Sequence, residues 1–249
     1  MKKIFRILIT VAVILIAAFI GLFAAFQVRY LDMNGMVDSS GGVIGADMSW
    51  YQGDADMEKL KEQGISFVYL KATEGTKYTD DSFRKNWERA EEADLPAGAY
   101  HFFSYDSSGR TQAQNFIDTV GDLDGRLLPV VDVEYYGDKE DNPPDKDELR
   151  QELQEFLDCL EEHYGVKPMI YTRVDLYRGY LMGAFGDYRK WFCSMNVPLR
   201  MVYWGDWDIW QYTDQGRLEG YSGDQERLDL NVLNRHTTLE SLTVHSQEN

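Results

Sequence analysis

The sequence has little of several residue types on which whole protein classes depend. Two cysteines in 249 residues are too few for a small scaffold built from disulfides. The four histidines include no spaced pair of the kind that binds zinc, and neither a glycine-rich phosphate loop nor a Gly-x-Ser-x-Gly elbow occurs. Lys and Arg number 25 against 42 Asp and Glu, a net charge of −17, whereas phosphate recognition needs a basic surface. We therefore expect no nucleic-acid partner, no metal ion and no cofactor.

The residues that are present suffice for a folded domain. Aromatic residues make up 14% of the chain, too many for a disordered acidic protein. A chain of this length favours one domain of about 200 residues with a substantial core. Cys159 falls in a predicted helix and Cys193 in a predicted strand, which favours two buried free thiols and leaves a disulfide between them as the alternative.

The amino-terminal segment differs from the rest of the chain. Residues 7–28 run ILITVAVILIAAFIGLFAAFQV without a charge, long enough to cross a bilayer core of about 30 Å as a helix. Lys2, Lys3 and Arg6 precede it, so the positive-inside rule places residues 1–6 in the cytoplasm and the remainder outside the cell membrane. The alternative is a cleaved signal peptide, whose apolar region is usually shorter. We predict a single-pass anchor, or a secreted protein if the segment is cleaved.

The exported part divides into three segments. Residues 29–42 read as a flexible tether, residues 43–236 as a folded catalytic domain, and residues 237–249 as a polar tail. Beyond Tyr30 the chain carries 21 basic against 42 acidic side chains. Polyanions repel so acidic a domain at low salt, which favours a neutral partner or one held by close contacts.

Short apolar runs alternate with amphipathic stretches after residue 42. The predicted strands are 43–46, 65–70, 97–102, 127–134, 168–171, 190–195, 207–212 and 228–230, and the predicted helices are 56–63, 81–93, 111–120 and 145–164. This β-α repetition implies parallel strands covered by helices, and the helical pattern thins after Tyr171. We predict an α/β fold, an irregular TIM-like (β/α) barrel with degenerate late units, with a doubly wound open sheet as the alternative.

Four acidic residues fall where predicted strands end, the usual place for chemistry in such barrels: Asp47, Asp132, Glu134 and Asp229. Asp132 and Glu134 are two residues apart on one strand, so both point to the same face. Neighbouring carboxylates in a partly dry site cannot both ionise easily, which yields a proton donor beside an acceptor. Glycosidic cleavage requires such a pair. Helix capping and Mg²⁺ or Ca²⁺ binding are the alternatives.

Seven segments in order resemble glycoside hydrolase family 25, the Chalaropsis-type lysozymes that cleave bacterial peptidoglycan. They are GADMSWYQG (45–53), YLKATEG (69–75), GAYHF (98–102), PVVDVE (129–134), YT (171–172), WQY (210–212) and LDLN (228–231). The resemblance implies a β/α barrel with degenerate late units. It also implies hydrolysis of the β-1,4 bond between N-acetylmuramic acid and N-acetylglucosamine. The sequence departs from the family pattern in the run Trp50-Tyr51-Gln52, which is one aromatic residue richer than is usual.

The resemblance also implies roles for individual residues. Glu134 matches the proton donor, Asp132 the carboxylate that orients the N-acetyl group or stabilises developing charge, and Asp47 and Asp229 two further acids of the catalytic groove. The candidates for substrate binding are Tyr100, Trp210, Gln211, Lys71 and Tyr171. For Lys71, an ion pair with Glu74 or Asp47 is an equal alternative. A retaining, inverting or substrate-assisted mechanism stays open.

Two other functions stay open beside the membrane-anchored muramidase. One is a catalytically weak peptidoglycan-binding or scaffold protein on the same fold. The other is a glycosidase of another N-acetylated glycan. The sequence identifies neither a protein partner, nor an oligomeric state, nor a biological role.

Overall fold

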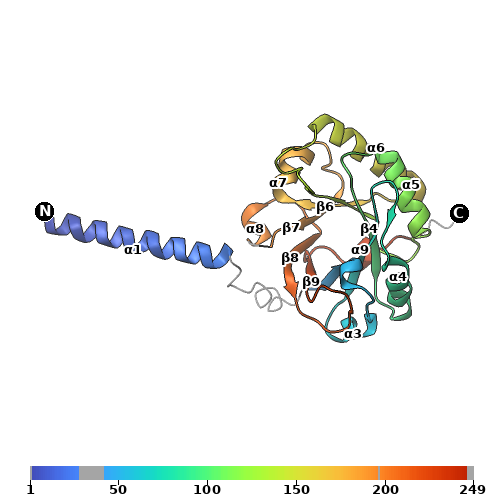
Figure 1. The fold of residues 1–249 in the computed structure, drawn as a ribbon, viewed down its shortest axis with the longest axis horizontal. Coiled ribbons are helices and arrows are strands. Elements are labelled where there is room, and N and C mark those ends of the chain that lie inside the picture. Colours follow the sequence, from blue (N-terminus) through green and yellow to red (C-terminus); the bar gives the residue numbers. More distant parts are fainter. Residues whose placement is uncertain (1, 28–41, 196, 246–249) are drawn as a thin grey trace. The chain divides into compact units, whose positions relative to one another are not determined.

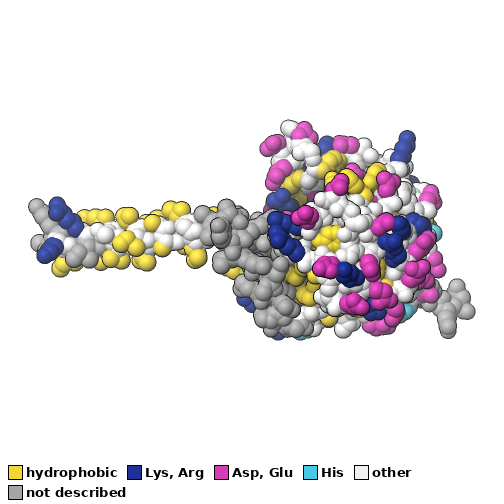
Figure 2. All heavy atoms as spheres, turned by 60° about the horizontal axis from the view of Figure 1, so that its bottom comes forward, with side chains coloured by type: hydrophobic (Ala, Val, Ile, Leu, Met, Phe, Trp, Pro, Cys, Tyr) yellow, Lys and Arg dark blue, Asp and Glu magenta, His cyan; other side chains and the backbone are white. Residues whose placement is uncertain are grey.

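The computed structural model describes residues 2–27, 42–195 and 197–245, which belong to two units. The first unit contains helix α1, Lys2–Gln27, whose described side chains are mostly hydrophobic after Lys3 and Arg6 (Figures 1 and 2). Its stretch Lys3–Phe23 is long and apolar enough to cross a membrane by length and composition. The predicted tether lies outside the described residues except for Gly42.

The second unit is a closed barrel of eight strands. They are β1 Ile44–Met48, β2 Phe67–Glu74, β4 Ala97–Phe102, β5 Val130–Val133, β6 Met169–Arg173, β7 Arg189–Cys193, β8 Ile209–Gly216 and β9 Leu228–Leu233. The ring closes because β1 pairs with both β2 and β9. The short β3, Tyr78–Thr79, adds to β2 outside the ring. Closure confirms the predicted barrel and excludes the open doubly wound sheet.

Strand β9 runs in the opposite direction to the rest of the ring. It pairs antiparallel with both β1 and β8, whereas the other neighbours in the ring are parallel. Asp229, which we predicted at the end of a strand, is therefore the second residue of β9. It still reaches the predicted face, because an antiparallel strand begins where its parallel neighbours end.

Helices cover the outside of the barrel, as Figure 1 shows. The predicted ones are α3 Met57–Glu62, α4 Phe83–Glu92, α5 Gly109–Val120 and α6 Lys146–Tyr164. Helix α6 begins where the Asp145 side chain accepts from two backbone N–H groups and ends at Gly165 in the left-handed conformation. Later units have only short helices: α7 Val174–Leu176, the π-helical turn η2 Tyr177–Leu181, and α8 Leu199–Val202. The predicted degeneracy of the late units is confirmed.

The predicted polar tail is wrong for residues 239–244. Helix α9, Leu239–Leu242, packs on the barrel, with Leu242 fully buried and Val244 nearly so. The backbone N–H of Leu128 donates to the Leu242 carbonyl at 2.7 Å, and that of Val244 donates to the Arg126 carbonyl at the same distance. Two apolar side chains within a polar stretch are enough to dock it, so the folded unit extends through Val244.

Large rings and small residues alternate inside the barrel. A Cβ atom on Gly98 would lie 2.1 Å from the Tyr69 ring, so only glycine leaves room for this ring in the barrel. The Tyr69 ring in turn packs 4.9 Å from that of Trp191. His101, next to Tyr100 on β4, is buried on the opposite side and lies between Thr73 and Gln112.

Candidate active site

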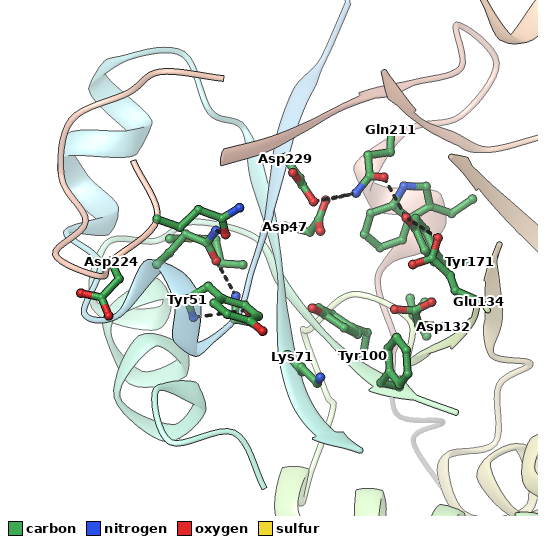
Figure 3. Close-up of a pocket in the computed structure, with 17 residues that line it drawn as sticks. Asp47, Tyr51, Lys71, Tyr100, Asp132, Glu134, Tyr171, Gln211, Asp224 and Asp229 are labelled. Carbon is green, nitrogen blue, oxygen red and sulfur yellow. Dashed lines mark hydrogen bonds between the residues drawn. The ribbon is translucent and has the colours of Figure 1, made fainter. Parts of the chain in front are cut away.

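A cavity of about 520 Å³ opens where the parallel strands end (Figure 3). Eight of the nine predicted site residues line it: Asp47, Lys71, Tyr100, Asp132, Glu134, Tyr171, Gln211 and Asp229. They come from seven of the eight strands of the ring or the residues next to them. The closed barrel thus brings together residues spread over more than 180 positions of the sequence.

Trp210 is not among the residues that line the cavity. Its indole Nε1 donates to the Ser194 carbonyl at 2.9 Å. Because neighbouring residues of a strand point to opposite faces, Gln211 enters the barrel and Trp210 turns away from it. The position of Trp210 therefore supports packing between strands and not the predicted substrate contact.

Asp132 and Glu134 project from the end of β5 into the cavity, as their spacing predicts (Figure 3). Asp132 is 7% exposed, and its Oδ1 atom is buried without a hydrogen-bond partner among the described residues. Burial and then the charge of Glu134 raise the pKa of Asp132, while the charge of Lys71 lowers it. Burial and then the charge of Asp47 raise the pKa of Glu134 to about 7. A carboxyl group that stays protonated near neutral pH can give its proton to a leaving oxygen.

Asp47 and Asp229 form a second acidic pair in the cavity. They are register partners on β1 and β9, and the Gln211 Nε2 atom donates to both, at 2.9 and 3.3 Å respectively. The Asn231 side chain also donates to Asp47, at 2.8 Å. Burial raises the pKa of Asp47 to about 6, although these amide donors oppose the shift. The amides therefore hold carboxylate oxygens that the barrel interior would otherwise leave poorly solvated.

Tyr171 connects the two acidic pairs. Its hydroxyl lies 2.7 Å from Oε1 of Gln211 and 3.4 Å from Oε1 of Glu134. Gln211 is 1% exposed, so its amide holds neighbouring side chains and offers a sugar almost no surface. Tyr171, at 6% exposed, still lines the cavity.

Lys71 and Tyr100 lie on the wall between β2 and β4. The Lys71 Nζ atom forms an ion pair with Glu74 at 2.7 Å and lies 4.8 Å from the centre of the Phe102 ring. Of the two ion pairs that the sequence left open, the structure contains the one with Glu74. Burial raises the pKa of Tyr100 well above its usual value, so this residue presents a neutral hydroxyl to the cavity.

Trp191 lines the cavity and Asn231 lies behind its wall, and neither was a predicted site residue. They are joined by a hydrogen bond of 2.8 Å from the indole Nε1 to the amide Oδ1. Asn231 could have been found, because it lies two residues after Asp229 and shares its face. Tyr51, at the end of the cavity away from Glu134 in Figure 3, stacks on Trp50 with ring centres 4.0 Å apart.

The described residues offer little to a metal ion and contain no disulfide. No group of three or more His, Cys, Asp or Glu side chains in the described ranges is placed to hold a metal. Cys159 and Cys193 are both free, as the favoured prediction has it, but both are partly exposed and not buried.

The folded unit is similar in sequence and structure to known proteins. The model of glycosyl hydrolases family 25 matches residues 46–221. The chain is 34% identical over 213 residues to Lysozyme M1 of Streptomyces globisporus. The match covers 79% of this chain and 70% of that protein. It is similar to the solved structure of a family 25 glycosyl hydrolase from Bacillus anthracis, with 39% identity, a TM-score of 0.73, and coverage of 81% and 94%. A bacterial lysozyme from Streptomyces coelicolor has a TM-score of 0.68 at 28% identity, with coverage of 82% and 98%.

Proposed function

The chain belongs to glycosyl hydrolase family 25, and from this premise we propose that it is a membrane-anchored 1,4-β-N-acetylmuramidase with Glu134 as proton donor. The family of lysozymes and muramidases makes it a glycoside hydrolase that acts on peptidoglycan. The finer proposal concerns the bond between N-acetylmuramic acid and N-acetylglucosamine. The observation that carries it is the pair of carboxyl groups that line the cavity together, Asp132, which is buried, and Glu134, which is partly buried.

The first chemical step uses the proton that this pair retains. Glu134 donates it to the glycosidic oxygen as the bond from that oxygen to the muramic-acid anomeric carbon breaks. Water then supplies the hydroxyl group of the new reducing end, and the proton that this water loses restores Glu134. Burial and the charge of Glu134 raise the pKa of Asp132, and the charge of Lys71 opposes this rise. A hydrogen-bond donor from the substrate adds to the effect of Lys71, so that Asp132 ionises in the complex and the proton stays on Glu134. The ionised Asp132 stabilises the positive charge that develops on the sugar ring.

Asp132 also fits the N-acetyl group of the substrate. Its Oδ1 atom is buried and has no hydrogen-bond donor among the described residues, an arrangement that is costly unless a donor arrives. The N–H of an acetamido group is such a donor, and both sugars of peptidoglycan carry one. This orphaned oxygen supports an N-acetylated substrate over an unsubstituted glycan.

The anchor is the second part of the proposal. Helix α1 follows a basic start and is apolar over Lys3–Phe23, which supports a single-pass helix with the folded unit outside the membrane. A cleaved signal peptide predicts instead a mature protein that lacks these residues. Mass measurement of the protein from washed membranes and from the culture medium separates the two.

The decisive experiment is reducing-end release from purified peptidoglycan by the full chain in detergent, with mass analysis of the products. We expect muropeptides that end in reducing N-acetylmuramic acid, and a loss of at least about 100-fold for Glu134→Gln with an unchanged melting temperature. Peptidoglycan binding without product would support the glycan-binding alternative. Cleavage of chitin in place of peptidoglycan would support the other glycosidase.

A further inference from the structure

A chain of hydrogen bonds crosses the cavity wall, and its direction is fixed at one end by Trp191. The indole Nε1 atom carries a hydrogen and can only donate, so the Asn231 atom 2.8 Å away must be the carbonyl oxygen Oδ1. The amide nitrogen of Asn231 then faces Oδ2 of Asp47, at 2.8 Å. The orientation of this amide therefore follows from its partners and is not arbitrary.

The orientation of the Gln211 side-chain amide also follows from its partners. Its Nε2 atom lies within hydrogen-bond distance of two carboxylate oxygens, on Asp47 and Asp229, which need a donor. Its Oε1 atom must then face Tyr171, at 2.7 Å. An amide oxygen can only accept a hydrogen bond, so the Tyr171 hydroxyl donates its single hydrogen to Gln211.

The orientation of the Tyr171 hydroxyl determines what Glu134 meets. Two acceptors lie within reach of this hydroxyl, Gln211 Oε1 at 2.7 Å and Glu134 Oε1 at 3.4 Å, and its single hydrogen goes to the nearer one. The Tyr171 oxygen then turns a lone pair toward Glu134. We propose that Gln211 is a positioning residue which, by holding the Tyr171 hydrogen, withholds a donor from Glu134 and keeps this carboxyl in its protonated, proton-donating form. A protonated carboxyl can give a hydrogen bond to that lone pair, whereas a carboxylate cannot. The inference rests on the proposed role of Glu134 as the acid.

Other groups also act on Glu134, and any test must separate them from Tyr171. The titratable and charged groups that face it are Asp132 on β5, Asp47 on β1, Asp229 on β9, Lys71 on β2, Tyr100 on β4, Tyr105 after β4, Tyr171 and Arg173 on β6, Asp175 on α7, and Cys193 on β7. Burial is the largest influence on the pKa of Glu134, followed by the charge of Asp47. Because Gln211 contacts Asp47 and Asp229 as well as Tyr171, a change at Gln211 reaches Glu134 by two routes.

The test is Gln211→Met in the full chain, purified in detergent. The variant releases the Tyr171 hydrogen, which can then point at Glu134 and stabilise the carboxylate. We expect the alkaline limb of the pH–rate profile to move to lower pH by about one unit. An NMR titration of labelled glutamate side chains, assigned with Glu134→Gln, should show the same movement. The NMR titration measures the pKa of Glu134 directly and does not require the protein to be active. Absence of muramidase activity would therefore count against the proposed function and not against this inference.

The background variant Tyr171→Phe separates the two routes. A shift through Tyr171 disappears when Gln211→Met is made in this background, whereas a shift through Asp47 and Asp229 persists. Gln211→Glu is the matched control of similar size, since it keeps an acceptor toward Tyr171 and should not move the limb to lower pH. It also replaces Gln211→Met if that variant does not fold, because a downward shift in Gln211→Glu contradicts the proposal. No shift in Gln211→Met, or an equal shift in the Tyr171→Phe background, overturns it.

Discussion

Asp47 and Asp229 lie directly opposite each other on two antiparallel strands, and one amide nitrogen, Nε2 of Gln211, donates to both. Two carboxylates so close together in a partly buried cavity repel each other when both are ionised. Burial raises the pKa of Asp47 to about 6. The barrel therefore keeps this pair at a cost to its own stability, which is typical of residues retained for function.

That cost gives Asp47→Asn a defined pH dependence. The folded pKa of about 6 exceeds the unfolded value of 3.8, so the unfolded chain ionises first as the pH rises. Over this window the free energy of unfolding of the wild type falls, by a total on the order of 3 kcal/mol. The variant lacks this fall, so denaturation at pH 4 and pH 7 should show its relative stability improving by about that amount.

Asp54→Asn is the control of opposite sign. The Lys85 side chain beside Asp54 lowers the pKa of that exposed carboxyl, so its ionisation favours the folded state. This variant should lose stability relative to the wild type as the pH rises. Parallel pH curves for Asp47→Asn and the wild type would show that Asp47 is not held with a raised pKa.

The alkaline side of the wild-type pH–rate profile should report Glu134. Its pKa of about 7 means that the proton-donating form declines above neutral pH, by about tenfold for each further unit. Hydrolysis of an aryl glycoside should lack this limb, because a phenolate leaves without needing a proton. The comparison is a steady-state rate measurement on both substrates. A limb shared by both would assign it to another group or to unfolding.

The sequence predicted the strands that carry the site because apolar runs and acids recur at strand ends in a regular order. It did not predict the direction of β9, since LDLN has the same alternation whichever way the strand runs. It also predicted Gln211 for substrate contact, although this residue lines the cavity with almost no exposed surface. Such roles depend on hydrogen-bond partners such as Asp47 and Tyr171, which lie far away in the chain.

Trp50 tests whether the end of the cavity at Tyr51, away from Glu134, binds glycan. It is 42% exposed and stacks on Tyr51, which lines that end, so the two rings present apolar faces to a sugar. We expect Trp50→Ala to raise KM for peptidoglycan roughly 2- to 10-fold with little change in kcat. The matched control is Trp204→Ala, since this indole is 91% exposed and, unlike that of Trp50, is joined by no described ring contact to a residue that lines the cavity. Equal effects of the two variants would contradict a glycan contact at Trp50.

The docked carboxyl-terminal segment predicts a stability effect far from the chemistry. Leu242 is fully buried although it stands in a polar stretch, and its carbonyl accepts from the backbone N–H of Leu128, close to the start of β5. Leu242→Ala should therefore lower the free energy of unfolding by about 2–4 kcal/mol through the lost contacts and the cavity left behind. Glu240→Ala, on the exposed side of the same short helix, should change it by less than about 0.5 kcal/mol.

Because β5 carries Asp132 and leads directly to Glu134, a chain that ends at residue 237 should lose muramidase activity at a lower temperature than the full chain. Thermal inactivation of the two forms measures this difference. Coincident curves would show that residues 238–249 do not contribute to the stability of the active site.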